Sequence, residues 1–170
     1  MDKITKILVD CFLDGGKVLI CGNGGSAAMS QHIASDLVGR LGTDDDMPLP
    51  AIALTDPAVI TAIANDFGYH EVFAHQVRVM AKQDDVLMVL TTSGESENIV
   101  EACMTARDMG IDIVGFWGDG VGVWKNLGMM IEYCSDVQLE GTEAIQEYHL
   151  REAHRLCREV KAQIATYLGD

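Results

Sequence analysis

Apolar residues recur along the chain in two patterns, and the two patterns alternate. Short uninterrupted apolar runs bounded by turn residues predict buried strands, which we expect at 18–21, 51–54, 86–90, 111–117 and 131–139. Apolar residues spaced three and four positions apart predict helices, which we expect at 1–13, 27–41, from 56 onward, 71–80, 98–109, 123–127 and 142–168. Residues 65–69 are expected to form a loop.

Strands that alternate with helices indicate parallel pairing and right-handed crossovers. The fold class expected is therefore α/β, with a doubly wound parallel sheet of five strands, helices on both faces in three layers, and a long C-terminal helix. No linker or repeat divides the 170 residues. A chain of this length suits one domain, residues 1–170.

The loop after the first expected strand contains residues suited to holding a ligand. Gly22, Gly24 and Gly25 permit a tight reversal and a close approach to the backbone. Ser26 is expected to cap the next helix, whose first amides have no partners within the helix and can cradle an anion. An ordinary strand-to-helix turn without a ligand is the alternative interpretation.

A second loop that follows a strand is rich in hydroxyl groups. Its hydroxyl residues are Thr91, Thr92, Ser93 and Ser96. Helix capping would need one or two of them, so four favour a neutral phosphate site made of hydroxyls and unpaired amides. In doubly wound sheets, ligands bind beyond the carboxyl ends of the strands where the winding reverses. We therefore expect the two loops to share one site.

Charge restricts what this site can bind and how. The chain has 12 basic and 26 acidic residues and a formal net charge of −14, which disfavours nucleic acid and acidic membrane surfaces as partners. An anion must then be held by local donors. No apolar run reaches the roughly 20 residues that cross a bilayer, and no signal-peptide core is present, which indicates the cytoplasm. The scattered cysteines are expected to be buried, reduced thiols.

Histidines and an acid on two expected helices are candidates for chemistry. His32 and Asp36 are four residues apart and share one helix face. Gln146, His149 and His154 lie on the final helix. A single histidine on such a face is more often structural than a ligand, so the residues alone leave both interpretations open.

Several motifs follow one another in the order found in sugar isomerase (SIS) domains. They are 22–26, 31–34, 39–40, 65–68, 92–94 and 145–147. From about Gly15 to the C-terminus the chain resembles, more narrowly, the bacterial phosphoheptose isomerases. The resemblance implies the SIS fold, a cytoplasmic homotetramer, and conversion of sedoheptulose 7-phosphate to D-glycero-D-manno-heptose 7-phosphate through an enediol.

Two other functions remain open on the same resemblance. One is a non-catalytic SIS adaptor that binds a sugar phosphate or the bacterial replication initiator. The other is an isomerase of the same fold that acts on hexose or pentose phosphates.

The resemblance also implies roles for individual positions. Substrate contacts would come from Asn23, Gly24, Gly25, Ser26, Asn65, Asp66 and Gln146, phosphate contacts from Thr91, Thr92, Ser93 and Ser96, and a nearby cation from Arg40. One zinc ion per subunit would be bound by His32, Asp36, Gln146 and His154. Asp36 would act as the base and His154 as its catalytic partner.

The chain departs from the family pattern at several places. Asp36 replaces a glutamate and is one methylene shorter, and Glu95 replaces a neutral residue, so Glu95 is expected to face solvent. The family usually has about one more helix before the first strand, so part of the subunit packing is expected to be absent. Gln146 and His154 are roughly 12 Å apart along a helix, so they meet one metal only if both lean toward it, or they serve different subunits.

Overall fold

Five parallel strands form one sheet in the computed structural model, which describes residues 2–39, 41, 47–118, 131–133 and 141–169. The strands are β1 (Val18–Gly22), β2 (Ala51–Ala53), β3 (Val86–Thr91), β4 (Asp112–Trp117) and β5 (Ile131–Tyr133), in the order β2-β1-β3-β4-β5. Every neighbouring pair is parallel. The predicted doubly wound α/β fold is confirmed.

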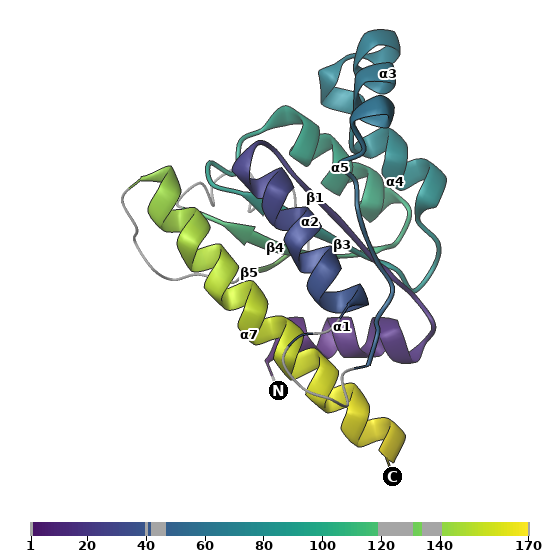
Figure 1. Ribbon diagram of the computed structural model, residues 1–170. Coiled ribbons are helices and arrows are strands. Elements are labelled where there is room, and N and C mark those ends of the chain that lie inside the picture. Colours follow the sequence, from purple (N-terminus) through teal and green to yellow (C-terminus); the bar gives the residue numbers. More distant parts are fainter. Residues whose placement is uncertain (1, 40, 42–46, 119–130, 134–140, 170) are drawn as a thin grey trace.

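Helices cover both faces of this sheet (Figure 1). They are α1 (Lys3–Leu13), α2 (Gly25–Val38), α3 (Pro57–Phe67), α4 (Ala74–Met80), α5 (Glu97–Asp108) and α7 (Thr142–Gly169), with a 3-10 turn η1 (Tyr69–Glu71) between α3 and α4. Val18 and Ile20 contribute to the core beneath α1, α2 and α7, whereas Leu19 and Cys21 contribute to the core beneath α3, α4 and α5. This alternation follows from the two-residue repeat of a strand.

Three local predictions are wrong. Helix α2 begins at Gly25 with Gly24 as its N-cap, so Ser26 is buried inside the first turn and caps nothing. Helix α3 continues to Phe67, because Gly68, with φ of 97°, is the residue that ends it; Asn65 and Asp66 are therefore helical. The helix expected at 71–80 is divided into η1 and α4. The expected helix at 123–127 and the strand residues 134–139 lie outside the described residues.

The order of the strands determines which loops meet. The chain passes from β1 outward to β2 and then returns across β1 to β3. Gly22 lies opposite Leu90 at the ends of β1 and β3. The two loops singled out in the sequence therefore leave the sheet side by side, at the point where the winding reverses.

The thiol side chains of the described residues are buried, as expected, whereas Cys134 lies outside the described residues. Cys11, Cys21, Cys103 and Cys157 are buried, and burial raises the pKa of the Cys11 thiol to about 12. Within the described part of the chain, none of the helices has the length and apolar character needed to cross a bilayer.

His149 is a fully buried imidazole on α7. It is 0% exposed, and its ring lies 5.8 Å from the Phe116 ring, centroid to centroid. Burial lowers the pKa of His149, and the backbone of Trp117 partly opposes that shift. The folded protein therefore favours a neutral imidazole at this position.

Replacing His149 with Gln should flatten the dependence of stability on pH in mild acid. The unfolded chain protonates His149 near pH 6.5, whereas the folded chain does so only at lower pH. Stability is therefore fully present above about pH 6.5 and is lost as pH falls through the folded pKa. The free energy of unfolding, measured in urea at several pH values, should change more steeply with pH in the wild type than in His149→Gln. The difference in slope should be at most about 1.4 kcal/mol per pH unit. His70→Gln, at an exposed position, is the control; identical slopes in all three proteins would contradict the assignment.

Candidate active site at the ends of β1 and β3

The absence of a side chain at Gly25 allows the Gln146 side chain of α7 to lie against the loop after β1. Gly24 has φ of 56°, in the left-handed region that favours glycine. A Cβ placed on Gly25 would lie 2.6 Å from the Gln146 Nε2 atom. The amide of Gln146 therefore lies directly over the glycine loop.

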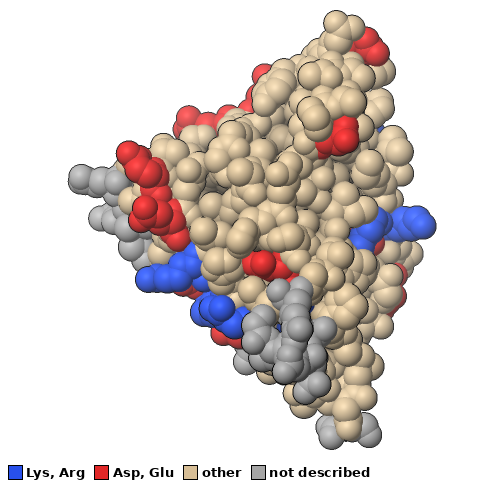
Figure 2. All heavy atoms as spheres, viewed as in Figure 1, with Lys and Arg blue, Asp and Glu red and all other residues tan. Residues whose placement is uncertain are grey.

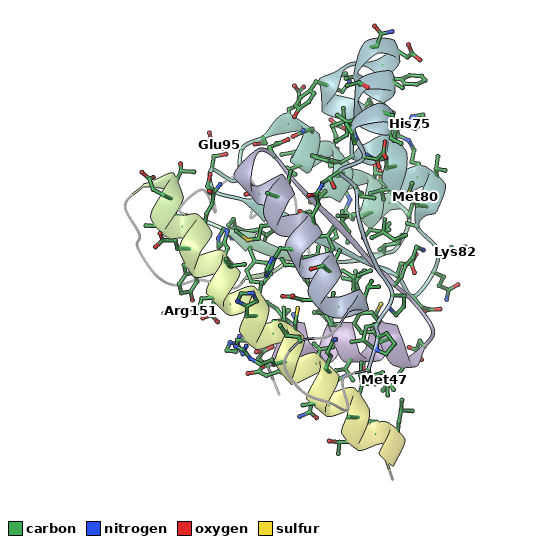
Figure 3. The ribbon with its side chains drawn as sticks, in the orientation of Figure 1. Met47, His75, Met80, Lys82, Glu95 and Arg151 are labelled. Carbon is green, nitrogen blue, oxygen red and sulfur yellow. The ribbon has the colours of Figure 1, made fainter. Side chains whose placement is uncertain are left out.

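Helices α2 and α7 lie alongside one another and run in the same direction (Figure 1). Contacts between the two helices, or just beyond the end of α2, occur at three successive levels. Gln146 lies at Gly25, His154 lies at His32, and Lys161 Nζ donates a hydrogen bond to the Gly39 carbonyl at 2.8 Å. Side chains fill the space between the two helices (Figure 3).

The middle level holds a cluster of His32, Asp36 and His154. The two imidazole Nε2 atoms are 2.8 Å apart. Asp36 Oδ2 lies 3.4 Å from the His32 Nε2 atom and 3.5 Å from that of His154. This oxygen is buried and has no hydrogen-bond partner within the described residues. Three of the four residues predicted to bind zinc are therefore brought together.

The cluster has the composition and spacing of a metal site. Imidazole nitrogen and carboxylate oxygen are zinc ligands, and ligand atoms around a tetrahedral zinc lie about 3.3–3.4 Å from one another. Two of the three separations match that value and the third is shorter, so a small outward rotation of the imidazoles would accommodate an ion. A buried carboxylate oxygen without a donor is also what a cation would satisfy.

Gln146 does not reach this cluster within the chain. It lies at Gly25, and His32 is seven positions further along α2, which is about 10 Å along a helix. The structure thus assigns Gln146 and His154 to two different levels. It places Gln146 with the glycine loop.

The hydroxyl loop after β3 is held by its own backbone. Thr91 Oγ1 accepts a hydrogen bond from the Gly94 amide at 3.1 Å, and Ser93 Oγ accepts one from the Glu95 amide at 3.2 Å. Ser96 is the N-cap of α5, yet its side chain makes no capping bond. Helix capping therefore does not account for these hydroxyls. Glu95 faces solvent, as expected (Figure 3).

Sequence reasoning missed two residues that join the loops. Asn98, in the first turn of α5, exchanges two hydrogen bonds of 2.9 Å with the amide of Asn23. The hydroxyl of Tyr69 donates to Asn23 Oδ1 at 3.0 Å. These partners are 75 and 46 residues from Asn23 in sequence. The only available sequence signal was the closeness of Asn98 to the hydroxyl loop.

Two predicted substrate residues lie apart from the cluster. Asn65 and Asp66 are exposed at the end of α3, where Asn65 Nδ2 donates to Asp66 Oδ1 at 2.8 Å. Arg40, the predicted cation, lies outside the described residues.

The face that carries α2 and α7 is largely uncharged despite the net charge of −14 (Figure 2). Most acidic and basic side chains seen on it lie toward its margins. An anionic ligand would therefore meet few charged side chains on this face.

Comparisons with known proteins agree with this geometry. A family model described as SIS domain matches residues 1–118. The phosphoheptose isomerase of Crocosphaera subtropica is 44% identical, and the match covers 99% of this chain and 85% of that protein.

Two solved structures share both fold and sequence. A phosphoheptose isomerase from Francisella tularensis has a TM-score of 0.85 and 38% identity, over 94% of this chain and 83% of that one. The phosphoheptose isomerase from Neisseria gonorrhoeae has a TM-score of 0.82 and 35% identity, over the same shares. The chain therefore belongs to the SIS-domain family and, within it, to the phosphoheptose isomerases.

Proposed function

We propose that this chain is an aldose–ketose isomerase that converts sedoheptulose 7-phosphate to D-glycero-D-manno-heptose 7-phosphate. The observation that carries the proposal is the cluster of His32, Asp36 and His154, which lies on the helix that follows the glycine loop and on the final helix. The relatives named phosphoheptose isomerase support the same reaction. A non-catalytic adaptor would have no need for this cluster.

The two loops divide the substrate between them. The phosphate would be bound by the hydroxyls of Thr91, Thr92, Ser93 and Ser96 and the first amides of α5. The open-chain sugar would lie across residues 23–26 and beneath the Gln146 amide, which contacts that loop. Arg40, Asn65 and Asp66 remain proposed substrate contacts on the family resemblance alone.

Asp36 is the proposed base that moves a proton between C1 and C2. Its Oδ2 atom has no hydrogen-bond partner among the described residues, so no hydrogen-bond donor occupies the lone pair that would accept the proton. The proton leaves the carbon next to the carbonyl, which gives an enediol, and returns to the neighbouring carbon. His154 would protonate or orient the substrate oxygen from the adjacent helix.

His32, Asp36 and His154 would hold one zinc ion per subunit, and bound zinc supplies Lewis-acid polarisation of the sugar carbonyl. We assign Gln146 to the sugar rather than to the metal, since it lies at the level of Gly25.

We also infer a homo-oligomer, a tetramer in keeping with the family resemblance, that acts in the cytoplasm. Helix α3 is apolar, but Ile63 is its only buried residue, and Phe67 and Tyr69 beyond it are exposed. A second copy of the chain would cover such a surface. The buried thiols of the described residues support a reducing compartment.

Purified protein supplied with zinc should interconvert sedoheptulose 7-phosphate and its aldose isomer. His154→Ala should lower kcat at least about 100-fold, since it removes a proposed proton-transfer group. His75→Ala is the matched control: His75 lies on α4 and stacks on Phe67, away from α7 (Figure 3). A coupled assay or NMR of the products measures both. Inactive wild-type protein would rule out this function and favour the adaptor.

Zinc content should depend on the cluster and not on other histidines. Elemental analysis of dialysed protein should find about one zinc per chain in the wild type and in His75→Ala. His32→Ala and His154→Ala should each lose most of it. Equal zinc content in all four proteins would show that the ion is held elsewhere.

Lengthening the acid should impair the enzyme. Asp36 Oδ2 already lies within 3.5 Å of both imidazoles. One further methylene would push the carboxylate into them, and we expect Asp36→Glu to lower kcat by about tenfold. Asp36→Asn, which removes the base, should lower it by about 100-fold or more. Asp108→Glu, at an exposed position on α5, controls for added length. A higher kcat in Asp36→Glu would show instead that the aspartate is too short for its task.

A further inference from the structure

One chain of hydrogen bonds joins the glycine loop (residues 22–26), called the sugar loop because the sugar is proposed to bind there, to α5 and to η1. Asn23 follows β1, Asn98 lies in the first turn of α5, and Tyr69 begins η1. Asn23 Nδ2 donates to Asn98 Oδ1, and Asn98 Nδ2 donates back to Asn23 Oδ1, both at 2.9 Å. Tyr69 adds a third bond at 3.0 Å, to the same Oδ1 atom.

These bonds use most of the bonding capacity of the Asn23 amide. A side-chain amide has two acceptor positions on oxygen and two N–H donors. Asn98 and Tyr69 together occupy both acceptor positions of Asn23, and Asn98 occupies one of its N–H groups. Asn23 is left with a single N–H group.

Asn98, which anchors this arrangement, is more deeply buried than Asn23, the residue that it holds. Asn98 is 3% exposed and is fixed by α5, whereas Asn23 is only half-buried at the start of a loop. Asn98 also lies two residues after Ser96, on the helix whose first amides face the phosphate loop. A displacement of Asn98 would therefore change the separation of the sugar loop from the phosphate loop.

We propose that Asn98 and Tyr69 are positioning residues that hold the Asn23 amide in one orientation and present its remaining N–H to the sugar. This rests on the proposed function, because it assumes that the sugar lies across the glycine loop. Neither Asn98 nor Tyr69 needs to touch the substrate. Their effect on binding passes through Asn23.

The test is a pair of double-mutant cycles, with KM for sedoheptulose 7-phosphate and the inhibition constant of inorganic phosphate as readouts. Tyr69→Phe removes one hydroxyl from an exposed ring and should raise KM about 3- to 10-fold with little change in kcat. It should not alter inhibition by phosphate, since Tyr69 contacts only the sugar side. In an Asn23→Ala background, the same substitution should change KM less than about twofold, because the residue it acts through is gone.

Asn98→Ala forms the second cycle and should show the same loss of effect in the Asn23→Ala background. Gln76→Ala is the structural control: its buried amide donates to the carbonyls of Leu54 and Val72, away from the loops. It should lower stability without raising KM. If Asn98→Ala fails to fold, the Tyr69→Phe cycle decides the question alone.

Measuring binding as well as turnover distinguishes failure of the proposed function from failure of the positioning role. If the wild type binds the sugar phosphate by calorimetry without isomerising it, the proposed function fails, and the cycles are scored on dissociation constants. Equal effects of Tyr69→Phe with and without Asn23, or no effect in either, would overturn the positioning role in an active enzyme. Wild-type protein that neither binds nor converts sedoheptulose 7-phosphate would overturn both proposals.

Discussion

The site depends on the packing of α7 along α2, which brings His154 to His32 and the Gln146 amide to Gly25. A Cβ there would collide with the Gln146 amide. The same two helices meet at His32 and His154, and Ile33, Leu37, Leu156 and Val160 are buried in the core beneath them. Gly25 thus leaves room for the Gln146 amide over the glycine loop, and the buried apolar residues of both helices fix the level at which the two histidines meet.

The cluster of His32, Asp36 and His154 between these helices lowers the stability of the folded chain. A buried carboxylate oxygen without a donor loses solvation and gains no hydrogen bond in return. The apolar residues on either side of Asp36 in α2 offset that cost, since Ile33 and Leu37 are almost fully buried. The unpaired Asp36 oxygen stays buried only because the packing of the surrounding core holds its side chain in place, which is typical of functional sites. Either a cation or a transferable proton would satisfy the Asp36 oxygen.

Hydrophobic periodicity was sufficient to predict the layers, the parallel sheet and the two loops, because each depends on residues close in sequence. It was insufficient where several local choices compete. Ser26 has a good capping side chain, but Gly24 has the backbone conformation that a helix entry needs here. Asn98 and Tyr69 could not be predicted, since hydrogen bonds to Asn23 across 75 and 46 residues leave no periodic trace. The separate levels of Gln146 and His154 required the register of α7 against α2, which only tertiary packing fixes.

An acidic chain can hold a phosphate if its donors are local and neutral. The field of the formal charge of −14 is largely screened beyond about 8 Å at physiological salt. Backbone amides and hydroxyls act within a hydrogen-bond length, where screening by ions is ineffective. Glu95, the acid within the hydroxyl loop, is exposed, so its repulsion is weakened by solvent. The net charge should therefore slow the approach of a sugar phosphate more than it weakens the bound state. The rigidity of the loops then matters more than the charge, because fixed neutral donors bind an anion only when they already point at it.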